Sequence, residues 1–215
     1  MIPRRVVIVG AGDHGRVILE LLRASGTEPV GFVEVHSLPD EAGRRVDGLD
    51  VIGNLDAPAG WAVATPAFVV ALGDNRARRE AYERCLELGL EPEAAIHPRA
   101  ILLGGARVTP GAMVCAGAIV GVAATVGPNA IVNTGATVDH DNVIEAHAHV
   151  GPGAHLAGHV TVEEGAFVGI GSAVREGCRI GAWALVGGGA MVIGDVEDGG
   201  HVIGVPARPA VERGG

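Results

Sequence analysis

The second half of the chain has a hydrophobic pattern with a period of six. Between residues 96 and 197 an aliphatic residue recurs at every sixth position without interruption. This period does not fit one face of an α-helix, which repeats about every 3.6 residues. It fits short strands with one side chain pointing inward, joined at corners that carry Gly, Asn, Asp or Pro. The seventeen positions of the array are Ile96, Leu102, Val108, Val114, Val120, Val126, Val132, Val138, Ile144, Val150, Leu156, Val162, Val168, Val174, Ile180, Val186 and Val192.

A second column, of small residues, indicates how the hexads stack. The residue four positions after each aliphatic is alanine in twelve of the seventeen hexads. Residues one turn apart stack directly in a repeat protein, so a deviation shared every third hexad predicts a three-sided coil of three hexads per turn. Each coil would bury three branched aliphatics, at about 1.5–3 kcal/mol each before conformational entropy is subtracted. Four of the five exceptions lie eighteen residues apart, at Asn142, Val160, Cys178 and Val196.

The first ninety residues show a different pattern, in which strands alternate with helices. Residues 4–9 predict a buried parallel strand, residues 16–25 a helix and residues 29–33 a second strand. Between the first strand and the helix lies a glycine-rich loop, Gly10-Ala11-Gly12-Asp13-His14-Gly15. Glycines in this context let the backbone approach a diphosphate at the positive end of a helix. The order of strand, loop, helix and strand therefore predicts a nucleotide-binding loop.

The region is too short for a full dinucleotide-binding fold. In that fold Glu34 would hold a ribose hydroxyl, close to the expected distance from the loop. A dinucleotide requires two such halves, and the region supplies about four strands, the last two at residues 68–72 and 93–96, with a further short strand near 51–52. The pattern favours a nucleoside diphosphate over a dinucleotide, and a loop that only closes a turn stays open as a third interpretation.

A second loop follows the strand at residues 68–72. It contains Gly73 and Asp74 and leads into a helix expected at residues 76–88. Four arginines of this helix are interpreted as a solvated face rather than as phosphate ligands: Arg76, Arg78, Arg79 and Arg84.

Charge and cysteine content restrict the partners and the compartment. A net charge of −9 disfavours nucleic acid and anionic membrane surfaces. The cysteines Cys85, Cys115 and Cys178 form no metal-binding pair and predict free thiols in a reducing cytoplasm. We expect neither a signal peptide nor a membrane-spanning segment.

Five segments together resemble a known family. They are VVIVGAGDHGRVILELL, ALGDNRARR, IHPRA, NTGATVDHDNVIEAHAHVGPGAHLAG and IGVPAR. Their combination resembles the bacterial hexapeptide-repeat sugar acetyltransferases that act on sialic acid oxygens or on the amines of nucleotide-linked sugars. The resemblance implies an α/β, Rossmann-like half domain at residues 1–92, followed by a left-handed parallel β-helix at residues 93–215.

The resemblance also implies site residues and partners. His140 would be the catalytic base, with Asp141 as its acidic neighbour, and His149 would contact the acyl donor. The co-substrate would be acetyl-CoA, no metal would be needed, and the product would enter polysaccharide biosynthesis. The acetyl-CoA site would further include Gly158, Ser172, Ala173, Pro206, Ala207 and Arg208, and the nucleotide-sugar site Gly10, Gly12, Asp13, His14, Gly15, Glu34, Gly73 and Asp74.

Stacking in a coil of eighteen residues gives His140 specific neighbours. It places His140 between Val122 and Gly158, with Glu176 two turns away. A glycine above the base would leave room for an acyl group, and its N–H could face the thioester oxygen as this becomes negative, so Gly158 is a candidate oxyanion donor. Asp141 would orient the imidazole and stabilise its charged form, provided that a corner of the coil bends the chain there.

One outward column of the coil is apolar except for a single histidine. Its members are repeated at intervals of eighteen residues, and an exposed apolar ladder is most simply a subunit interface. The histidine would then lie between protomers, next to His140 of the same or a neighbouring chain, which is consistent with the trimers of the family. The column contains Met113, Ile131, His149, Phe167 and Leu185.

These observations predict direct transfer of acetyl from acetyl-CoA to the amine of a nucleotide-linked 4-amino-4,6-dideoxy sugar. The main alternative is O-acetylation of sialic acid, which gives the glycine loop nothing obvious to hold. A zinc-dependent, carbonic-anhydrase-like protein is a further alternative, but no two histidines have the five-residue spacing of that family. A sensor or scaffold without activity would leave His140, Asp141 and His149 without a role.

Overall fold

The structure is a computed structural model in which residues 5–37, 43–58, 60–62 and 67–210 are described. The chain divides into two compact units, Met1–Pro98 with Pro110–Ala112, and Arg99–Thr109 with Met113–Gly215. Residue 4, the first of the predicted strand 4–9, lies outside the described residues.

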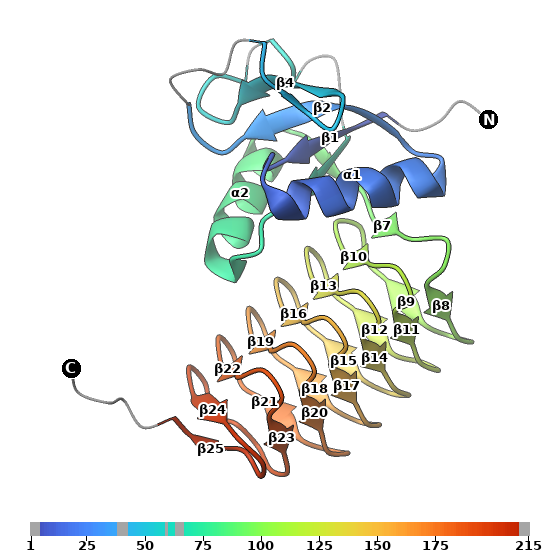
Figure 1. The fold of residues 1–215 in the computed structure, drawn as a ribbon, viewed down its shortest axis with the longest axis vertical. Coiled ribbons are helices and arrows are strands. Elements are labelled where there is room, and N and C mark those ends of the chain that lie inside the picture. Colours follow the sequence, from blue (N-terminus) through green and yellow to red (C-terminus); the bar gives the residue numbers. More distant parts are fainter. Residues whose placement is uncertain (1–4, 38–42, 59, 63–66, 211–215) are drawn as a thin grey trace. The chain divides into compact units, whose positions relative to one another are not determined.

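The first unit is built on a six-stranded sheet (Figure 1). The strand order is β3-β4-β2-β1-β5-β6, and β1 pairs in parallel with both β2 and β5. Since the chain moves from β1 to one side and then returns to the other, the carboxyl ends of β1 and β5 form the switch point at which such sheets bind ligands. The elements are β1 (Arg5–Val9), α1 (Asp13–Ser25), β2 (Glu28–Glu34), β3 (Arg45–Val46), β4 (Leu49–Asn54), β5 (Ala67–Val70), α2 (Asn75–Glu87) and β6 (Glu91–Pro92).

Helix α1 begins three residues earlier than the apolar spacing indicates. Its N-cap is Gly12, which makes no side-chain capping hydrogen bond, so the sequence carries no polar cap to mark the start. Asp13, His14 and Gly15 consequently form the first turn of the helix. Gly26 ends the helix in the left-handed conformation.

One strand of the first unit was predicted wrongly. Residues 93–96 do not form a strand of this sheet. Its sixth strand is β6, Glu91–Pro92, and β7, Ala95–Ile96, belongs to a different sheet. A strand of two residues is too short to show an alternation of apolar and polar side chains. The sequence pattern therefore does not show that residues 91–96 contain two strands from different sheets.

The second unit is a parallel β-solenoid that matches a left-handed β-helix, as predicted. Most of the short strands pair in parallel with the strand eighteen residues further on, for example Thr137 with His155 and Val138 with Leu156. This register confirms three hexads per coil. Near the end of the solenoid the spacing falls to sixteen, where Leu185 pairs with His201. The three sheets have the orders β25-β24-β22-β19-β16-β13-β10-β7, β23-β20-β17-β14-β11-β8 and β21-β18-β15-β12-β9.

The strands of the solenoid are almost all two residues long. They are β7 (Ala95–Ile96), β8 (Ile101–Leu102), β9 (Arg107–Val108), β10 (Met113–Val114), β11 (Ile119–Val120), β12 (Thr125–Val126), β13 (Ile131–Val132), β14 (Thr137–Val138), β15 (Val143–Ile144), β16 (His149–Val150), β17 (His155–Leu156), β18 (Thr161–Val162), β19 (Phe167–Val168), β20 (Ala173–Val174), β21 (Arg179–Ile180), β22 (Leu185–Val186), β23 (Met191–Val192), β24 (His201–Ile203) and β25 (Arg208–Pro209).

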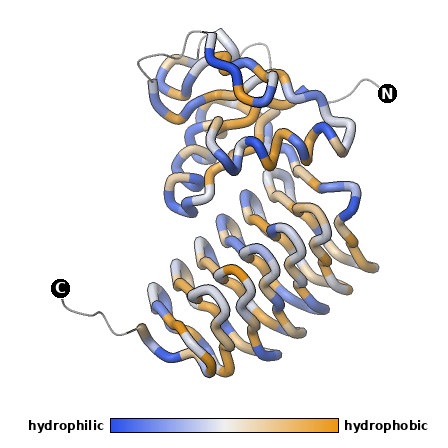
Figure 2. Tube along the Cα trace, in the orientation of Figure 1, coloured by the Kyte–Doolittle hydropathy of each residue, from blue (hydrophilic) through white to orange (hydrophobic). Residues whose placement is uncertain are grey.

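The two columns seen in the sequence form the core of the solenoid. From Val114 to Val192, every aliphatic of the hexad series is at most 2% exposed. The small residues four positions later are buried as well, including Asn142, whose Oδ1 accepts a hydrogen bond from the N–H of Val160. Figure 2 shows the hydrophobic positions recurring from coil to coil. At the start of the array Leu102 is 42% exposed, so the first coil is less completely covered.

Corners of the solenoid use the left-handed backbone region. Glycine occupies many of these positions, but several carry side chains, among them Asp141 with φ of 57° and His159 with φ of 58°. Within the described residues, no helix is long and apolar enough to cross a membrane. All three cysteines are free and buried.

Candidate active site

His140 and Asp141 lie at the corner between β14 and β15. The left-handed conformation of Asp141 supplies the bend that the sequence argument required, because it turns two adjacent side chains toward each other. The Nδ1 atom of His140 lies 2.9 Å from Oδ2 of Asp141. The backbone N–H of His140 donates to Oδ1 of Asp139 at 2.7 Å, which fixes the corner further.

The environment of His140 favours its protonated form. The hydrogen bond to Asp141 raises the pKa of His140, partial desolvation opposes that rise, and the charges of Asp139, Asp141 and Glu176 add to it. The contact with Asp141 is satisfied when Nδ1 carries the proton, which leaves Nε2 as an acceptor. An imidazole held in this way can take a proton at Nε2 and have the resulting charge stabilised at Nδ1.

Gly158 lies directly against the imidazole of His140. A Cβ atom at this position would lie 2.4 Å from Cε1 and 2.5 Å from Nε2 of His140. The expectation that this glycine leaves room for an acyl group is therefore wrong, since the ring itself occupies the space. Gly158 instead admits the imidazole, and any larger residue there would displace it.

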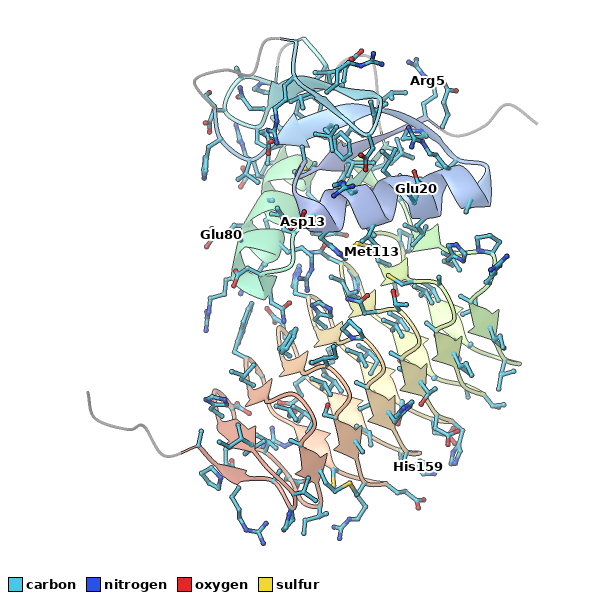
Figure 3. The ribbon with its side chains drawn as sticks, in the orientation of Figure 1. Arg5, Asp13, Glu20, Glu80, Met113 and His159 are labelled. Atoms are coloured by element: carbon cyan, nitrogen blue, oxygen red, sulfur yellow. The ribbon has the colours of Figure 1, made fainter. Side chains whose placement is uncertain are left out.

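A second histidine, His159, completes the cluster. Its Nε2 lies 3.8 Å from Oδ2 of Asp141, and its ring meets the ring of His140 edge-on with centroids 5.1 Å apart. Figure 3 shows His159 on the outside of the solenoid. One donor atom from each of His140, Asp141 and His159 lies within 4.8 Å of the others, a spacing that could admit a cation. A base role for His140 would require this site to be free of metal.

His149 lies on a different side of the solenoid from His140. It is the first residue of β16, and β16 belongs to neither of the two sheets that meet at the His140 corner. In a three-sided coil that corner faces away from the sheet containing β16. The Nε2 of His149 lies 3.0 Å from Nδ2 of Asn133, and its ring packs edge-on against Phe167 with centroids 4.9 Å apart. The structure therefore does not bring His149 and His140 together within one chain.

The apolar column around His149 is largely buried in the single chain. Met113 and Ile131 are fully buried and His149 is 6% exposed, whereas Phe167 is half-buried and Leu185 is 38% exposed. The expected ladder of exposed apolar residues is therefore wrong for its first three members. Periodicity identifies which residues point outward from a coil, but not how deeply each of them is buried.

Two residues assigned to acetyl-CoA have contrasting positions. Ser172 is fully buried and its hydroxyl donates to the carbonyl of Gly169 at 2.7 Å, so its side chain is part of the core and cannot contact a ligand. It occupies the inward column of small residues, where alanine is usual. Ala173 is the first residue of β20 and is partly exposed.

The C-terminal segment folds back on the last strands of the solenoid. Strand β25 pairs antiparallel with β24, the N–H of Ala207 donates to the carbonyl of Met191 at 2.7 Å, and Pro206 follows a cis peptide bond. Ala207 and Arg208 line a cavity of about 340 Å³, which also has Asp195 and Glu197 in its wall. Arg208 is exposed and thus accessible to an anionic group.

The glycine loop of the first unit has one face left open. Gly10 has φ of 102°, and a Cβ there would lie 2.7 Å from Leu72; a Cβ on Gly15 would lie 2.2 Å from the carbonyl oxygen of Gly10. These two glycines are required for packing. Gly12 has no atom within 4 Å of its Cβ position, so its backbone is accessible to a ligand at the N-terminus of α1. Asp13, labelled in Figure 3, is the acidic residue of that first turn and is exposed.

His14 and Arg78 form the buried side of the loop. Burial, followed by the charge of Arg78, lowers the pKa of His14 to about 4. Arg78 is fully buried and donates to the carbonyl of Leu72 at 3.1 Å, and burial lowers its pKa to about 9. The interpretation of Arg78 as part of a solvated face is wrong. Its spacing with Ala81, Tyr82 and Cys85 places it on the buried face of α2. The prediction relied on the charge of Arg78 rather than on this spacing.

The remaining predicted residues of this unit have identifiable partners. Glu34, at the end of β2, forms an ion pair with Arg44. Asp74 is the N-cap of α2 and accepts a hydrogen bond from the N–H of Ala77 at 2.8 Å. Gly73 has open space at its Cβ position, and its loop follows β5, whose end pairs with the end of β1. Gly12 and Gly73 thus stand at the switch point of the sheet.

Comparison with known proteins covers both units. The PglD N-terminal domain family matches residues 5–85. A mutant of GDP-perosamine N-acetyltransferase from Caulobacter crescentus, solved with CoA and GDP-perosamine, is 38% identical, with 99% of each chain covered and a TM-score of 0.91. The acetyltransferase domain of PglB from Neisseria gonorrhoeae FA1090, solved with acetyl coenzyme A, is 35% identical, with 97% of this chain and 100% of that chain covered and a TM-score of 0.88.

A third structure supports the fold alone. WeeI from Acinetobacter baumannii AYE is 23% identical and has a TM-score of 0.83, with 96% of this chain and 100% of that chain covered. A search of curated protein sequences found no match.

Proposed function

This chain belongs to the hexapeptide-repeat sugar acetyltransferases, and we propose that it transfers acetyl from acetyl-CoA to the amine of a nucleotide-linked 4-amino-4,6-dideoxy sugar, with His140 as general base. The observation that carries the proposal is the His140 corner, where an exposed imidazole has Nδ1 bound to a carboxylate and Nε2 left as acceptor. Its relatives bind CoA or acetyl coenzyme A, and one also binds GDP-perosamine.

The reaction begins when the neutral amine of the sugar attacks the thioester carbonyl. His140 Nε2 accepts a proton from the nitrogen as the new C–N bond forms. Asp141 accepts the hydrogen bond from Nδ1–H and stabilises the imidazolium. A base of this kind supplies about 10²–10⁴-fold of the acceleration, so positioning of the two substrates supplies most of the rest.

The tetrahedral intermediate requires a donor for its oxyanion. We assign this role to the backbone N–H of Gly158. Gly158 lies in the coil next to His140, against the imidazole, and has no side chain that could shield its N–H. When the C–S bond breaks, the CoA thiolate leaves and takes up the proton that His140 received. No covalent enzyme intermediate is needed.

The first unit supplies the nucleotide site. The open backbone of Gly12 at the start of α1 offers N–H groups to a diphosphate, and Gly10 and Gly15 give the loop its shape. Because His14 is held neutral, it offers no positive charge to the phosphates. Gly73 lies on the opposite side of the switch point, and Asp74 fixes its loop by capping α2. Glu34 contacts a ribose hydroxyl only if it rearranges its ion pair with Arg44.

The assembly follows from the positions of the two histidines. If His149 contacts the acyl donor, it must come from a different protomer than His140, since the two lie on opposite sides of one solenoid. A second subunit would also cover His140 and Asp141, whose side chains are 46% and 49% exposed. We therefore propose a homotrimer with acetyl-CoA between subunits, bounded by Ala173 and by Pro206, Ala207 and Arg208. Free, buried cysteines support a cytoplasmic location.

A panel of acceptors tests the proposed reaction. Acetyl-CoA turnover is measured with UDP-, dTDP- and GDP-linked 4-amino sugars, and with sialic acid as the alternative acceptor. We expect turnover with at least one nucleotide-linked amino sugar and none with sialic acid. Turnover with sialic acid alone contradicts the N-acetyltransferase proposal. A metal chelator should leave the rate unchanged, and a loss of acetyl transfer that zinc restores would contradict the metal-free mechanism. Hydration of carbon dioxide by the zinc-loaded protein, without turnover of acetyl-CoA, would support the carbonic-anhydrase-like alternative.

The assembly has its own test. Light scattering at micromolar concentration should give the mass of three chains, and a monomer at that concentration would contradict the trimer.

A further inference from the structure

The carboxylate of Asp141 lies between two imidazoles. Its Oδ2 atom is 2.9 Å from Nδ1 of His140 and 3.8 Å from Nε2 of His159. The two rings are nearly perpendicular, at 85°, with centroids 5.1 Å apart. Thus the same oxygen that orients the base also faces a second group that can carry positive charge.

The backbone fixes His159 at this place. The N–H of His159 donates to the carbonyl of His140 at 3.1 Å, so His159 stacks on the coil that contains the base. Its φ of 58° is in the left-handed region, which is strained for a residue that has a side chain. Gly177, one coil further in the same corner column, avoids this strain. The imidazole at position 159 therefore occupies a corner that would be more stable with glycine.

We propose that His159 is a positioning residue of the acetyl transfer: it anchors the Asp141 carboxylate and limits rotation of the His140 ring, so that Nε2 of His140 points toward the amine. The inference rests on the proposed reaction with His140 as base.

The distance determines how His159 acts. At 3.8 Å from the carboxylate, the contact is longer than a hydrogen bond and operates through charge or through a bridging water. The edge-on ring contact restricts His140 from one side, and the bare backbone of Gly158 supports it from another. His159 moves no proton in the reaction. The proton passes from the amine to Nε2 of His140 and then to the leaving thiolate.

Kinetics of a double-mutant cycle test the proposal. His159→Asn removes the imidazole while keeping a residue type that tolerates the left-handed backbone. We expect kcat to fall about 3- to 10-fold, with the KM values of both substrates within about twofold, because the effect is on a partly exposed pair. In an Asp141→Asn background the same change should alter kcat by less than about twofold, since His159 acts through Asp141. His155→Asn, a neighbouring exposed histidine bonded to Thr137, is the matched control and should leave kcat unchanged.

Two kinetic outcomes overturn the proposal. One is an equal loss of kcat from His159→Asn in the presence and absence of Asp141. The other is a change confined to KM, which would make His159 a substrate contact. Circular dichroism and light scattering confirm that the variants retain fold and assembly.

A measurement without substrate separates this inference from the proposed function. If the edge-on contact with His159 limits rotation of the His140 ring, that ring should be more mobile in His159→Asn than in the wild-type protein and in His155→Asn. NMR relaxation of the His140 ring at one fixed pH measures this mobility. Equal mobility in the three proteins overturns the inference, whatever acceptor the enzyme uses, whereas failure of the whole acceptor panel refutes only the proposed reaction.

Discussion

The two units each place a histidine beside a glycine, with opposite chemical results. In the first unit His14 lies in the first turn of α1, and burial and the charge of Arg78 lower its pKa to about 4. In the solenoid His140 lies at an exposed corner, and the hydrogen bond to Asp141 raises its pKa. One histidine stays neutral and supports a loop. The other is placed to exchange protons.

The neighbouring glycines differ in the same way. Gly15 brings backbone against backbone, because a Cβ there would meet the carbonyl oxygen of Gly10. Gly158 makes space for a side chain, because a Cβ there would meet the ring of His140. The first unit therefore leaves backbone groups exposed, as at Gly12, whereas the solenoid presents side chains from corners that favour glycine. This difference predicts that substitutions in the two units will separate binding from chemistry.

The largest effect is expected from His140→Ala. Loss of the base should lower kcat by about 10²–10⁴-fold, with the KM for the nucleotide sugar nearly unchanged, because we propose that the first unit binds the nucleotide. Steady-state kinetics measure both constants, and light scattering checks the assembly. Activity close to wild type in an intact oligomer would remove His140 from the mechanism.

Gly158→Ala should have the next largest effect. The added methyl would lie 2.4 Å from Cε1 of His140 and force the ring away from Asp141 and the amine, so we expect kcat to fall about 10²-fold. The matched control is Gly104→Ala, which adds a methyl to another corner where no atom lies within 4 Å. The Gly104→Ala variant should retain wild-type activity. A crystal structure of Gly158→Ala in which the imidazole of His140 has not moved would contradict the explanation.

His14 should affect stability rather than chemistry. Because its pKa is lowered from 6.5 to about 4 in the folded protein, the unfolded chain binds more protons between these two values. Stability is therefore highest above pH 6.5 and falls as the pH approaches 4, by about 3 kcal/mol in total. Urea unfolding of the wild type and of His14→Gln across this range measures the difference. An identical pH dependence in the two proteins would mean that His14 is not held neutral.

The smallest effect is expected on the pH profile. His140 accepts a proton only when neutral, so the rate rises with pH through its raised pKa. Asp141→Asn removes the main cause of that rise, and we expect the acid limb of kcat/KM to move to lower pH while the plateau falls about tenfold. An acid limb at the same pH in both proteins would show that another group controls it.

Much of the solenoid could be predicted from the sequence. The period of six fixes which side chains enter the core, and the deviations at Asn142, Val160 and Cys178 give the number of hexads per coil. The corner at His140 was predicted with Gly158 as its neighbour, because stacking depends only on the count of residues. The same rule shows why Ser172 is in the core, although resemblance assigned it to the ligand.

Other features depend on three-dimensional contacts that the pattern of apolar and polar residues along the chain does not predict. The burial of Met113 and Ile131 requires knowledge of what covers an outward-facing side chain. Arg78 is buried against the preference of a charged residue, and only its helical spacing indicates this. The approach of His159 to Asp141 depends on left-handed corners that turn both side chains to the same side.

The eighteen-residue register also limits how the length of this protein can change in evolution. Deleting or duplicating one whole coil preserves the inward columns and moves later residues along the axis by one repeat. A change of a single residue instead turns the inward aliphatics outward in every following strand. Gene length in the second half of the chain should therefore vary in units of three hexads, and the coil containing Asp141 and the one containing His159 should be retained or lost together.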